Sequence, residues 1–364
     1  MLSHTNTTGR MPAIVLICTA AAATAFGADD LLAQAKQQAR PDPLLLTATN
    51  GGNNFLAVIN ARTKQTDFVP TGGLGGASGN AGGVAVSEGL AAVVNFGSSN
   101  VTIFARRGNA MEPVQTIKTS SQPLSVAFGH NHLVVLGQTT AESFPVYGNS
   151  VAANNDGVVQ LAKGDKSAAQ IVVYNDGVAY TEKSGSMAEL SLSTNGMAGL
   201  SGPNRPVLLP MAPNNDTPFG MVARGENVYV TIAHSNLEAL VVNGQIVASA
   251  ASLTPFKNSS GGFLHAPCWN TLSGQFLYSA DSPGKQLLRY LVSDSNIFFD
   301  KPGAATLTGP PTDLAADGGL LGVIDGGDGS TSNASLFDID SEGELSLRFA
   351  VKIAGPINGA AIIR

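Results

Sequence analysis

Seven polar residues recur along the chain, and their side chains have the chemistry of a binding or catalytic site. Each of them ends a short apolar run. They are Asn50, Asn95, Gln138, Glu182, His234, Asp281 and Asp325. Carboxylates, amides and an imidazole placed in one ring would bind a polar small molecule or a hard cation.

An alternative holds for the Asn and Asp members of this set. Asn50 and Asp325 each precede Gly-Gly, and Asn or Asp before Gly is ordinary hairpin chemistry that caps the backbone. Glu182 and His234 are less suited to turn geometry. Both interpretations, turn formation and ligand binding, therefore stay open, and we assign proton transfer to Glu182, His234 and Asp281.

His265 is a further candidate, in the segment FLHAPCW at 263–269. A histidine titrates near neutral pH and serves as a general acid or base. The alternative is a structural histidine that is hydrogen-bonded to a neighbouring repeat. Cys268 has no flanking base, so we expect a buried, inert thiol rather than a nucleophile.

The spacing of the seven residues predicts the fold. Successive members are separated by 45, 43, 44, 52, 47 and 44 residues. In each repeat an apolar run is followed by a Gly/Ser/Asn-rich turn and a second apolar run. A period of about 40–50 residues built from four short strands is typical of a β-propeller. The runs are 44–50, 90–95, 133–138, 177–182, 228–234, 276–281 and 320–325.

These runs are expected to be the second strand of each blade, counted outward from the central axis. A second strand is packed on both faces, which explains why the runs are almost continuously apolar. The first repeat has no innermost strand, whereas the last residues, 359–364 (GAAIIR), resemble one. We therefore predict an all-β, seven-bladed β-propeller over 44–364, closed by pairing of the C-terminal strand into the N-terminal blade.

In such a propeller the second-strand ends share one face with the connections that lead into the innermost strands. The seven polar residues should then surround one mouth of the central channel. His265 is expected within an innermost strand at 264–269. Two connections, 149–166 and 195–217, are longer than the repeat requires, and long loops are more often functional than structural.

The N-terminal residues have the plan of a targeting segment. Residues 1–27 combine a polar start, an Ala-rich apolar stretch and small residues at the cleavage positions, which predicts a secretory signal peptide. Residues 28–43 would be a short leader. Processing would remove Cys18 and leave Cys268 alone, so no internal disulfide is expected. The prediction is a secreted, periplasmic or extracellular monomer with no membrane span.

The net charge of the chain limits the classes of partner that it is expected to bind. The net charge is −6, only 13% of residues are charged, and no basic run is present. Nucleic acid is therefore not an expected partner, and a small-molecule ligand is. The sequence requires no cofactor, although a divalent cation in the channel is compatible with the ring.

The chain resembles the lactonase-type seven-bladed propellers, which include muconate-lactonising enzymes and 6-phosphogluconolactonases of that fold, and the related YVTN-repeat proteins. The resemblance is carried by four segments: 91–106 (AAVVNFGSSNVTIFAR), 228–242 (VYVTIAHSNLEALVV), 265–292 (HAPCWNTLSGQFLYSADSPGKQLLRYLV) and 337–345 (FDIDSEGEL). It implies His, Glu and Arg side chains around the channel. His265 matches the family's histidine, Glu182 is a positional analogue, and no arginine falls at a second-strand end.

Two functions follow. The first is a lactonase-like enzyme, or a lyase or isomerase on the same scaffold, acting on a small cyclic or carboxylated molecule. Its catalytic residues would be His265 and His234 as proton-transfer groups with Glu182 and Asp281 as partners, while Asn50, Asn95, Gln138 and Asp325 would bind the ligand. The second is a non-catalytic extracellular propeller that binds a ligand or a protein.

Overall fold

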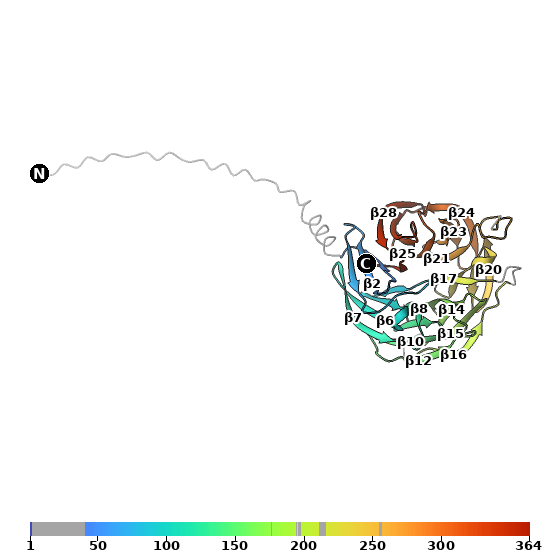
Figure 1. Cartoon of the computed structure of the whole chain (residues 1–364), viewed down its shortest axis with the longest axis horizontal. Coiled ribbons are helices and arrows are strands. Elements are labelled where there is room, and N and C mark those ends of the chain that lie inside the picture. The colour runs from blue at the N-terminus through green and yellow to red at the C-terminus, as the bar shows by residue number, and fades with distance from the viewer. Residues whose placement is uncertain (2–40, 176, 194, 196–197, 211–215, 255–256) are drawn as a thin grey trace. The chain divides into compact units, whose positions relative to one another are not determined.

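The computed structural model describes residues 1, 41–175, 177–193, 195, 198–210, 216–254 and 257–364. The predicted signal peptide and most of the predicted leader lie outside these residues. The part from Asp42 to Arg364 forms one compact unit of seven antiparallel sheets, a seven-bladed β-propeller (Figure 1). The predicted fold is confirmed.

In blades 2 to 4 the strands follow chain order from the central axis outward. In blade 1 the innermost strand is the C-terminal strand, and the next three follow chain order. Blade 1 is β29 (Asn358–Ile363), β1 (Leu44–Ala48), β2 (Phe55–Asn60) and β3 (Thr66–Pro70). Blade 2 is β4 (Val84–Ser87), β5 (Leu90–Asn95), β6 (Asn100–Arg107) and β7 (Ala110–Lys118). Blade 3 is β8 (Pro123–Gly129), β9 (His132–Gly137), β10 (Thr140–Tyr147) and β12 (Gly157–Gln160), with β11 (Ser150–Val151) also paired to β10. Blade 4 is β13 (Ala168–Tyr174), β14 (Gly177–Glu182), β15 (Ser186–Ser191) and β16 (Ser201–Pro206).

Blades 5 to 7 follow the same order. Blade 5 is β17 (Pro218–Arg224), β18 (Asn227–Ile232), β19 (Leu237–Val242) and β20 (Gln245–Ala251). Blade 6 is β21 (Pro267–Ser273), β22 (Phe276–Asp281), β23 (Gln286–Val292) and β24 (Ile297–Thr306). Blade 7 is β25 (Pro311–Asp317), β26 (Leu320–Asp325), β27 (Thr331–Ile339) and β28 (Leu345–Ala354). Two 3₁₀ turns, η1 (Phe96–Ser98) and η2 (Ala233–Ser235), follow β5 and β18.

The ring closes as the sequence predicts. β29 pairs antiparallel with β1, with Leu44 opposite Ile363 and Leu46 opposite Ala361. Every residue of β29 is buried. The C-terminal strand thus covers the edge that β1 would otherwise expose.

The core lies between the blades. The second strands β5, β14, β18, β22 and β26 are buried along their whole length, because each packs against a neighbouring blade on both faces. Between blades 1 and 2, for example, Leu46 of β1, Val93 of β5 and Ala361 of β29 belong to one buried cluster. This double-sided burial is the physical reason for the continuous apolar runs.

Three details differ from the sequence interpretation. The first long connection contains β11 and β12, and the second contains β16, so part of each is strand rather than loop. The expected innermost strand at 264–269 begins only at Pro267, which places His265 in the connection before it.

Among the described residues, no helix has the length and apolar character needed to cross a membrane.

Candidate functional site

A histidine and an aspartate predicted as site residues lie side by side in blade 6. Asp281 ends β22, and its backbone pairs with Pro267 at the start of β21. This register brings the segment just before β21 beside the end of β22. His265 Nδ1 lies 2.7 Å from Asp281 Oδ2. The sheet therefore assembles a His–Asp dyad from residues 16 positions apart.

The carboxylate of this dyad is fixed by the backbone and by its own strand neighbours. Asp281 is fully buried, and its Oδ1 accepts the N–H of Ala266 at 3.0 Å and that of Gly284 at 3.3 Å. Its Oδ2 also accepts the side-chain amide of Gln286 at 2.9 Å. A buried carboxylate with this many donors is held in one orientation, and it holds the imidazole in turn.

The Nε2 nitrogen of the His265 imidazole is placed to take part in proton transfer. The side chain of His265 is 24% exposed, and within the described part of the chain its Nε2 has no hydrogen-bond partner. With Nδ1–H donated to Asp281, Nε2 is the basic nitrogen. An imidazole oriented in this way can take a proton from water or from a carbon acid.

Blade 5 adds an aromatic and cationic neighbourhood. The ring of His234 stacks on Phe263, with centroids 4.6 Å apart and planes 10° apart. His234 Nδ1 also lies 2.7 Å from Thr217 Oγ1. Lys257 Nζ lies 4.7 Å from the centroid of the same Phe263 ring. Phe263 precedes His265 by two residues, so the connection that carries the histidine of the dyad also carries this aromatic ring.

Glu182 lies in another blade than this dyad, and its catalytic role stays a prediction. It ends β14 in blade 4 and is fully buried. Its two carboxylate oxygens accept the backbone N–H groups of Lys163 at 3.0 Å and Gly164 at 2.8 Å. No contact joins it to His265, His234 or Asp281 within the described residues. It holds the connection that enters blade 4.

Two of the predicted ligand-binding residues cap or brace neighbouring segments in a similar way. Asn50 Oδ1 accepts the N–H groups of Gly76 and Ala77. Asn95 is fully buried, and its Oδ1 accepts Thr71 Oγ1 at 2.7 Å. Both amides therefore hold the chain that follows blade 1.

The other two ligand-binding candidates lie in blades 7 and 3. Asp325 Oδ1 accepts the N–H of Gly327 at 2.7 Å and the side-chain amide of Asn333 at 2.8 Å. Gln138 is half-buried, and its backbone N–H bonds to Gln122 O. The binding role of all four residues stays a prediction.

A glycine-rich connection covers the channel mouth on the face where these residues lie. We call residues 71–83, which join β3 to β4, the plug loop. Its bonds reach blades 1, 3, 4, 6 and 7. They are Asn80 Nδ2 to Leu124 O and to Asn358 Oδ1, Ala81 N to Ala169 O, Lys183 Nζ to Gly79 O, Trp269 Nε1 to Asn80 O, and Gly82 N to Asp313 Oδ2.

The plug loop changes the expected site. One connection bonded to blades on opposite sides of the ring closes the channel from this face. The seven second-strand ends therefore do not surround an open mouth, and within the described residues no hydrogen bond joins the plug loop to the His265–Asp281 dyad. Sequence reasoning missed this closure, although the run TGGLGGASGNAGG at 71–83 is a composition that permits close backbone approach.

Two buried acids were also missed. Asp313 of β25 is 4% exposed, and burial raises its pKa to about 7. Glu238 of β19 is fully buried, and burial raises its pKa to about 8. Each lies in a largely apolar strand, where an acid among apolar residues was the available signal. Cys268 is half-buried, and desolvation raises its pKa to about 12; the inert thiol stays a prediction.

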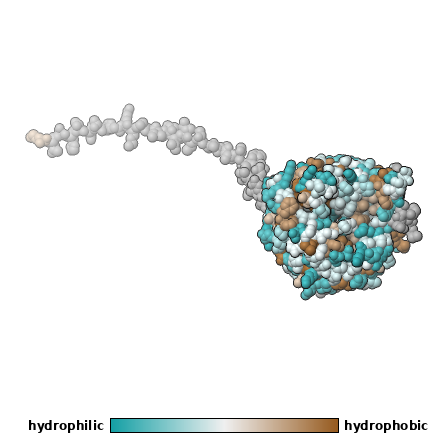
Figure 2. All heavy atoms as spheres, viewed as in Figure 1, coloured by the Kyte–Doolittle hydropathy of each residue, from teal (hydrophilic) through white to brown (hydrophobic). Residues whose placement is uncertain are grey.

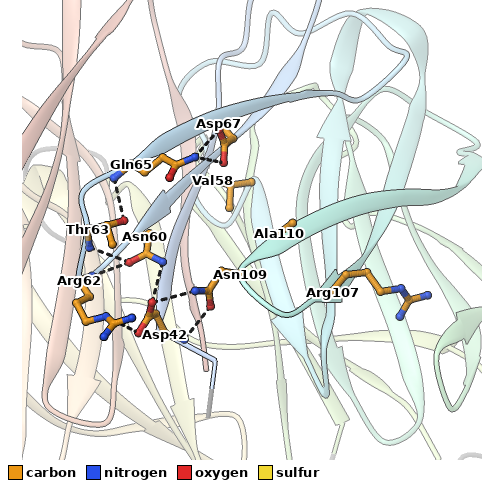
Figure 3. A pocket seen from close by; sticks show the side chains of 10 residues that line it. All are labelled: Asp42, Val58, Asn60, Arg62, Thr63, Gln65, Asp67, Arg107, Asn109 and Ala110. Atoms are coloured by element: carbon orange, nitrogen blue, oxygen red, sulfur yellow. Dashed lines mark hydrogen bonds and ion pairs between the residues drawn. The ribbon is translucent and has the colours of Figure 1, made fainter. Parts of the chain in front are cut away.

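A separate pocket lies where blades 1 and 2 meet (Figure 3), with a volume of about 330 Å³. Asp42 bonds to three of the side chains that line it. Its Oδ2 accepts the amides of Asn60 at 3.0 Å and Asn109 at 2.9 Å, and Arg62 lies 3.0 Å from Oδ1. Because these groups satisfy one another, we interpret the pocket as the anchor of the first residues of the propeller.

The surface seen in Figure 2 mixes hydrophilic and hydrophobic residues without an extended hydrophobic area. It therefore offers no large apolar face for a partner on this side. No group of three or more His, Cys, Asp or Glu side chains is placed to hold a metal ion among the described residues.

The chain matches no protein-family model, and no curated protein sequence is similar to it. Solved structures do share its fold. A protein from Lactobacillus plantarum aligns with a TM-score of 0.66 at 14% identity, over 89% of this chain and 100% of that one. A putative 6-phosphogluconolactonase from Bacteroides fragilis aligns with a TM-score of 0.63 at 12% identity, over 89% and 98%.

A third neighbour is virginiamycin B lyase from Staphylococcus aureus, solved as a catalytically inactive histidine-to-alanine variant with quinupristin. It aligns with a TM-score of 0.53 at 13% identity, over 78% of this chain and 92% of that one. The solved structures that this chain resembles thus include 6-phosphogluconolactonase-like seven-bladed propellers. At these identities the likeness establishes the fold, the seven-bladed propeller, and the site has to be argued from its own residues.

Proposed function

We propose that the protein is a lactonase-type enzyme that opens a small carboxylated lactone, with His265 as its general base. The observation that carries the proposal is the 2.7 Å contact between His265 Nδ1 and the fully buried Asp281. The lactonase-like fold of the neighbours supports it, as does a propeller lyase that is inactive without a histidine.

The proposed reaction uses only this dyad and water. His265 Nε2 takes a proton from a water molecule while the water oxygen attacks the lactone carbonyl carbon. The ring C–O bond then breaks, and the leaving alkoxide takes the proton back from the imidazolium, which yields a hydroxy acid. Asp281 stabilises the imidazolium between the two steps.

The neighbourhood of Phe263 supports a carboxylated substrate. The His234 ring stacks on Phe263, and the Lys257 ammonium lies over the same ring. An anionic group at the edge of this stack would meet the positive charge of Lys257. Lys257 would then act in binding, not in proton transfer.

The test is hydrolysis of a panel of γ- and δ-lactones, with and without a carboxylate, followed as acid release at constant pH. We expect His265→Gln to lower kcat/KM by about 10²–10⁴. Lys257→Met should raise KM for carboxylated lactones only. His130→Asn is the matched control, since His130 bonds to Tyr174 O away from the dyad. An unchanged rate for His265→Gln would refute the assignment.

We also propose secretion, supported by the signal-peptide pattern of residues 1–27. N-terminal sequencing of the exported protein tests it. The second candidate function, a non-catalytic binding propeller, is favoured by the plug loop, because a covered mouth leaves only the rim for catalysis. A panel on which the wild-type protein hydrolyses nothing would favour that candidate.

A further inference from the structure

The central channel forms a cavity below the plug loop that neither the dyad nor the proposed reaction uses. Its volume is about 270 Å³. The walls come from the innermost strands β4, β8, β13, β17, β21 and β25 together with Ala360 of β29. The cavity runs from Gly82 of the plug loop to Phe128, Val173 and Ala223, near the ends of their strands. It is therefore closed at the plug loop and continues toward the other face.

Most of the side chains that line this cavity are apolar. Some of the lining side chains are partly exposed. Gln170 is the polar side chain among them, and the others are aliphatic or aromatic. They include Ala85, Ala127, Phe128, Val173, Val222 and Ala315. Apolar surface held open to water is unfavourable, and concave apolar walls with a few polar groups at one end are the usual form of a small-molecule site.

The polar groups gather at the closed end, around Gly82. Gln170 Oε1 accepts the N–H of Met221 at 2.5 Å, which fixes the amide. Its Nε2 lies 3.5 Å from where a Cβ on Gly82 would stand, and it donates to no atom of the described residues. Gly82 N lies 2.9 Å from Asp313 Oδ2. One unpartnered donor and one carboxyl thus flank the same glycine.

We propose that this cavity binds a small apolar molecule with a single hydroxyl head, an alcohol or a phenol, whose hydroxyl lies at Gln170 and Asp313. A hydroxyl oxygen can accept the Gln170 N–H while its proton is donated to the Asp313 carboxyl. The apolar body packs on the alanine and valine walls. A carboxylate head would face Asp313 and is disfavoured.

The size of the cavity limits the ligand. A cavity of about 270 Å³ lies just below the usual size of small-molecule pockets, about 300–1,000 Å³, so it suits a one-ring phenol with a short alkyl chain. We therefore choose 4-propylphenol as the probe. Its methyl ether, 4-propylanisole, keeps the shape and the accepting oxygen and loses the donated proton.

Calorimetric titration of the full chain tests the proposal. We expect saturable 1:1 binding of 4-propylphenol and at least about tenfold weaker binding of the ether, the loss expected for one hydrogen bond to a buried group. Ala315→Leu should abolish binding by filling the cavity. Ala110→Leu, at an exposed position of β7, is the matched control and should bind as the wild type does.

A second variant and a crystal structure test the proposal even if Ala315→Leu fails to fold. Gln170→Glu keeps the oxygen that accepts the Met221 N–H and removes the N–H that would be donated to the ligand, so binding should weaken while the fold is retained. A crystal structure with 4-propylphenol should place its oxygen between Gln170 and Asp313. The proposal is overturned if the wild type shows no saturable binding, if the ether binds as well as the phenol, or if the ligand lies outside the channel.

Discussion

Asp313 of blade 7 accepts the backbone N–H of Gly82, 231 residues away in the sequence, at 2.9 Å. The same carboxyl accepts the N–H of its neighbour Leu314 and that of Ala360 in β29. One buried side chain thus joins the plug loop, blade 7 and the strand that closes the ring. We regard Asp313 as one of the residues that hold the plug loop in the channel.

Asp313→Ala should therefore loosen the plug loop and destabilise the protein. Removing the carboxyl leaves three buried N–H groups without acceptors, at about 1–3 kcal/mol each before relaxation. We expect a loss of about 3 kcal/mol in chemical denaturation and faster hydrogen exchange at 76–82. Asp317→Ala, which breaks an exposed contact with Arg364 on the neighbouring strand end, should cost less than about 1 kcal/mol. Equal losses in the two variants would contradict this role.

Glu238 makes the stability depend on pH. It lies fully buried between blades 5 and 6, where its Oε2 accepts Asn270 Nδ2 at 3.0 Å, and its Oε1 has no partner among the described residues. Burial raises its pKa from 4.5 to about 8. The folded protein therefore binds a proton that the unfolded chain releases above pH 4.5. This stabilisation is complete below that pH and is lost as the pH rises toward about 8.

Glu238→Gln should remove this dependence. The amide matches the neutral acid in shape, so we expect the variant to equal the wild type near pH ~5 and to exceed it near pH ~8, by at most on the order of 4 kcal/mol. Urea denaturation across this pH range measures the difference. Glu189→Gln is the control, an acid of the neighbouring β15 that is paired with Arg205. A Glu238→Gln curve parallel to that of the wild type would refute the protonated state.

The fold could be predicted because the repeat encodes it locally. Burial on both faces leaves a continuous apolar run in each second strand, and a run such as 90–95 is visible without any knowledge of its partners. Closure was predictable for a similar reason, since the first blade lacks an innermost strand and residues 359–364 supply one.

The site was only partly predictable because its contacts are long-range. The pairing of His265 with Asp281 follows from the register within one blade, so choosing both residues was within reach of the sequence. Glu182 was chosen for its chemistry, but its carboxylate bonds to the backbone at Lys163 and Gly164. The plug loop crosses the whole ring, and no local pattern indicates that Asp313 is its partner.

Gly75 is a glycine of the plug loop where a side chain would meet backbone. A Cβ there would lie 2.3 Å from the backbone carbon of Asn50, and backbone cannot rotate away as a side chain does. Gly75→Ala should therefore displace the loop and cost about 2–3 kcal/mol. At Gly72 a Cβ would meet nothing within 4 Å, and only the φ of +74° opposes it, so Gly72→Ala should cost about 1 kcal/mol.

Thermal unfolding compares the stability of Gly75→Ala with that of Gly72→Ala. The hydrogen exchange of the plug-loop amides shows whether the loop has moved. If Gly75→Ala were as stable as Gly72→Ala and kept slow exchange at Gly82, the close approach of the loop to Asn50 would be disproved.

Deleting residues 359–364 should destabilise the whole ring rather than one end. The deletion removes most of β29 and exposes the inner edge of β1 from Leu44 to Ala48. Burial of Ile362 and Ile363 alone contributes about 3–6 kcal/mol, a large part of the net stability of a typical domain. We expect a much lower Tm and faster hydrogen exchange in β25 as well as in β1, since both pack on β29. Deleting Arg364 alone is the control, because it breaks only its exposed contacts with Asp317 and Gly318. Faster exchange confined to β1, with the Tm unchanged, would show that the closing strand is an accessory and that the other blades stand without it.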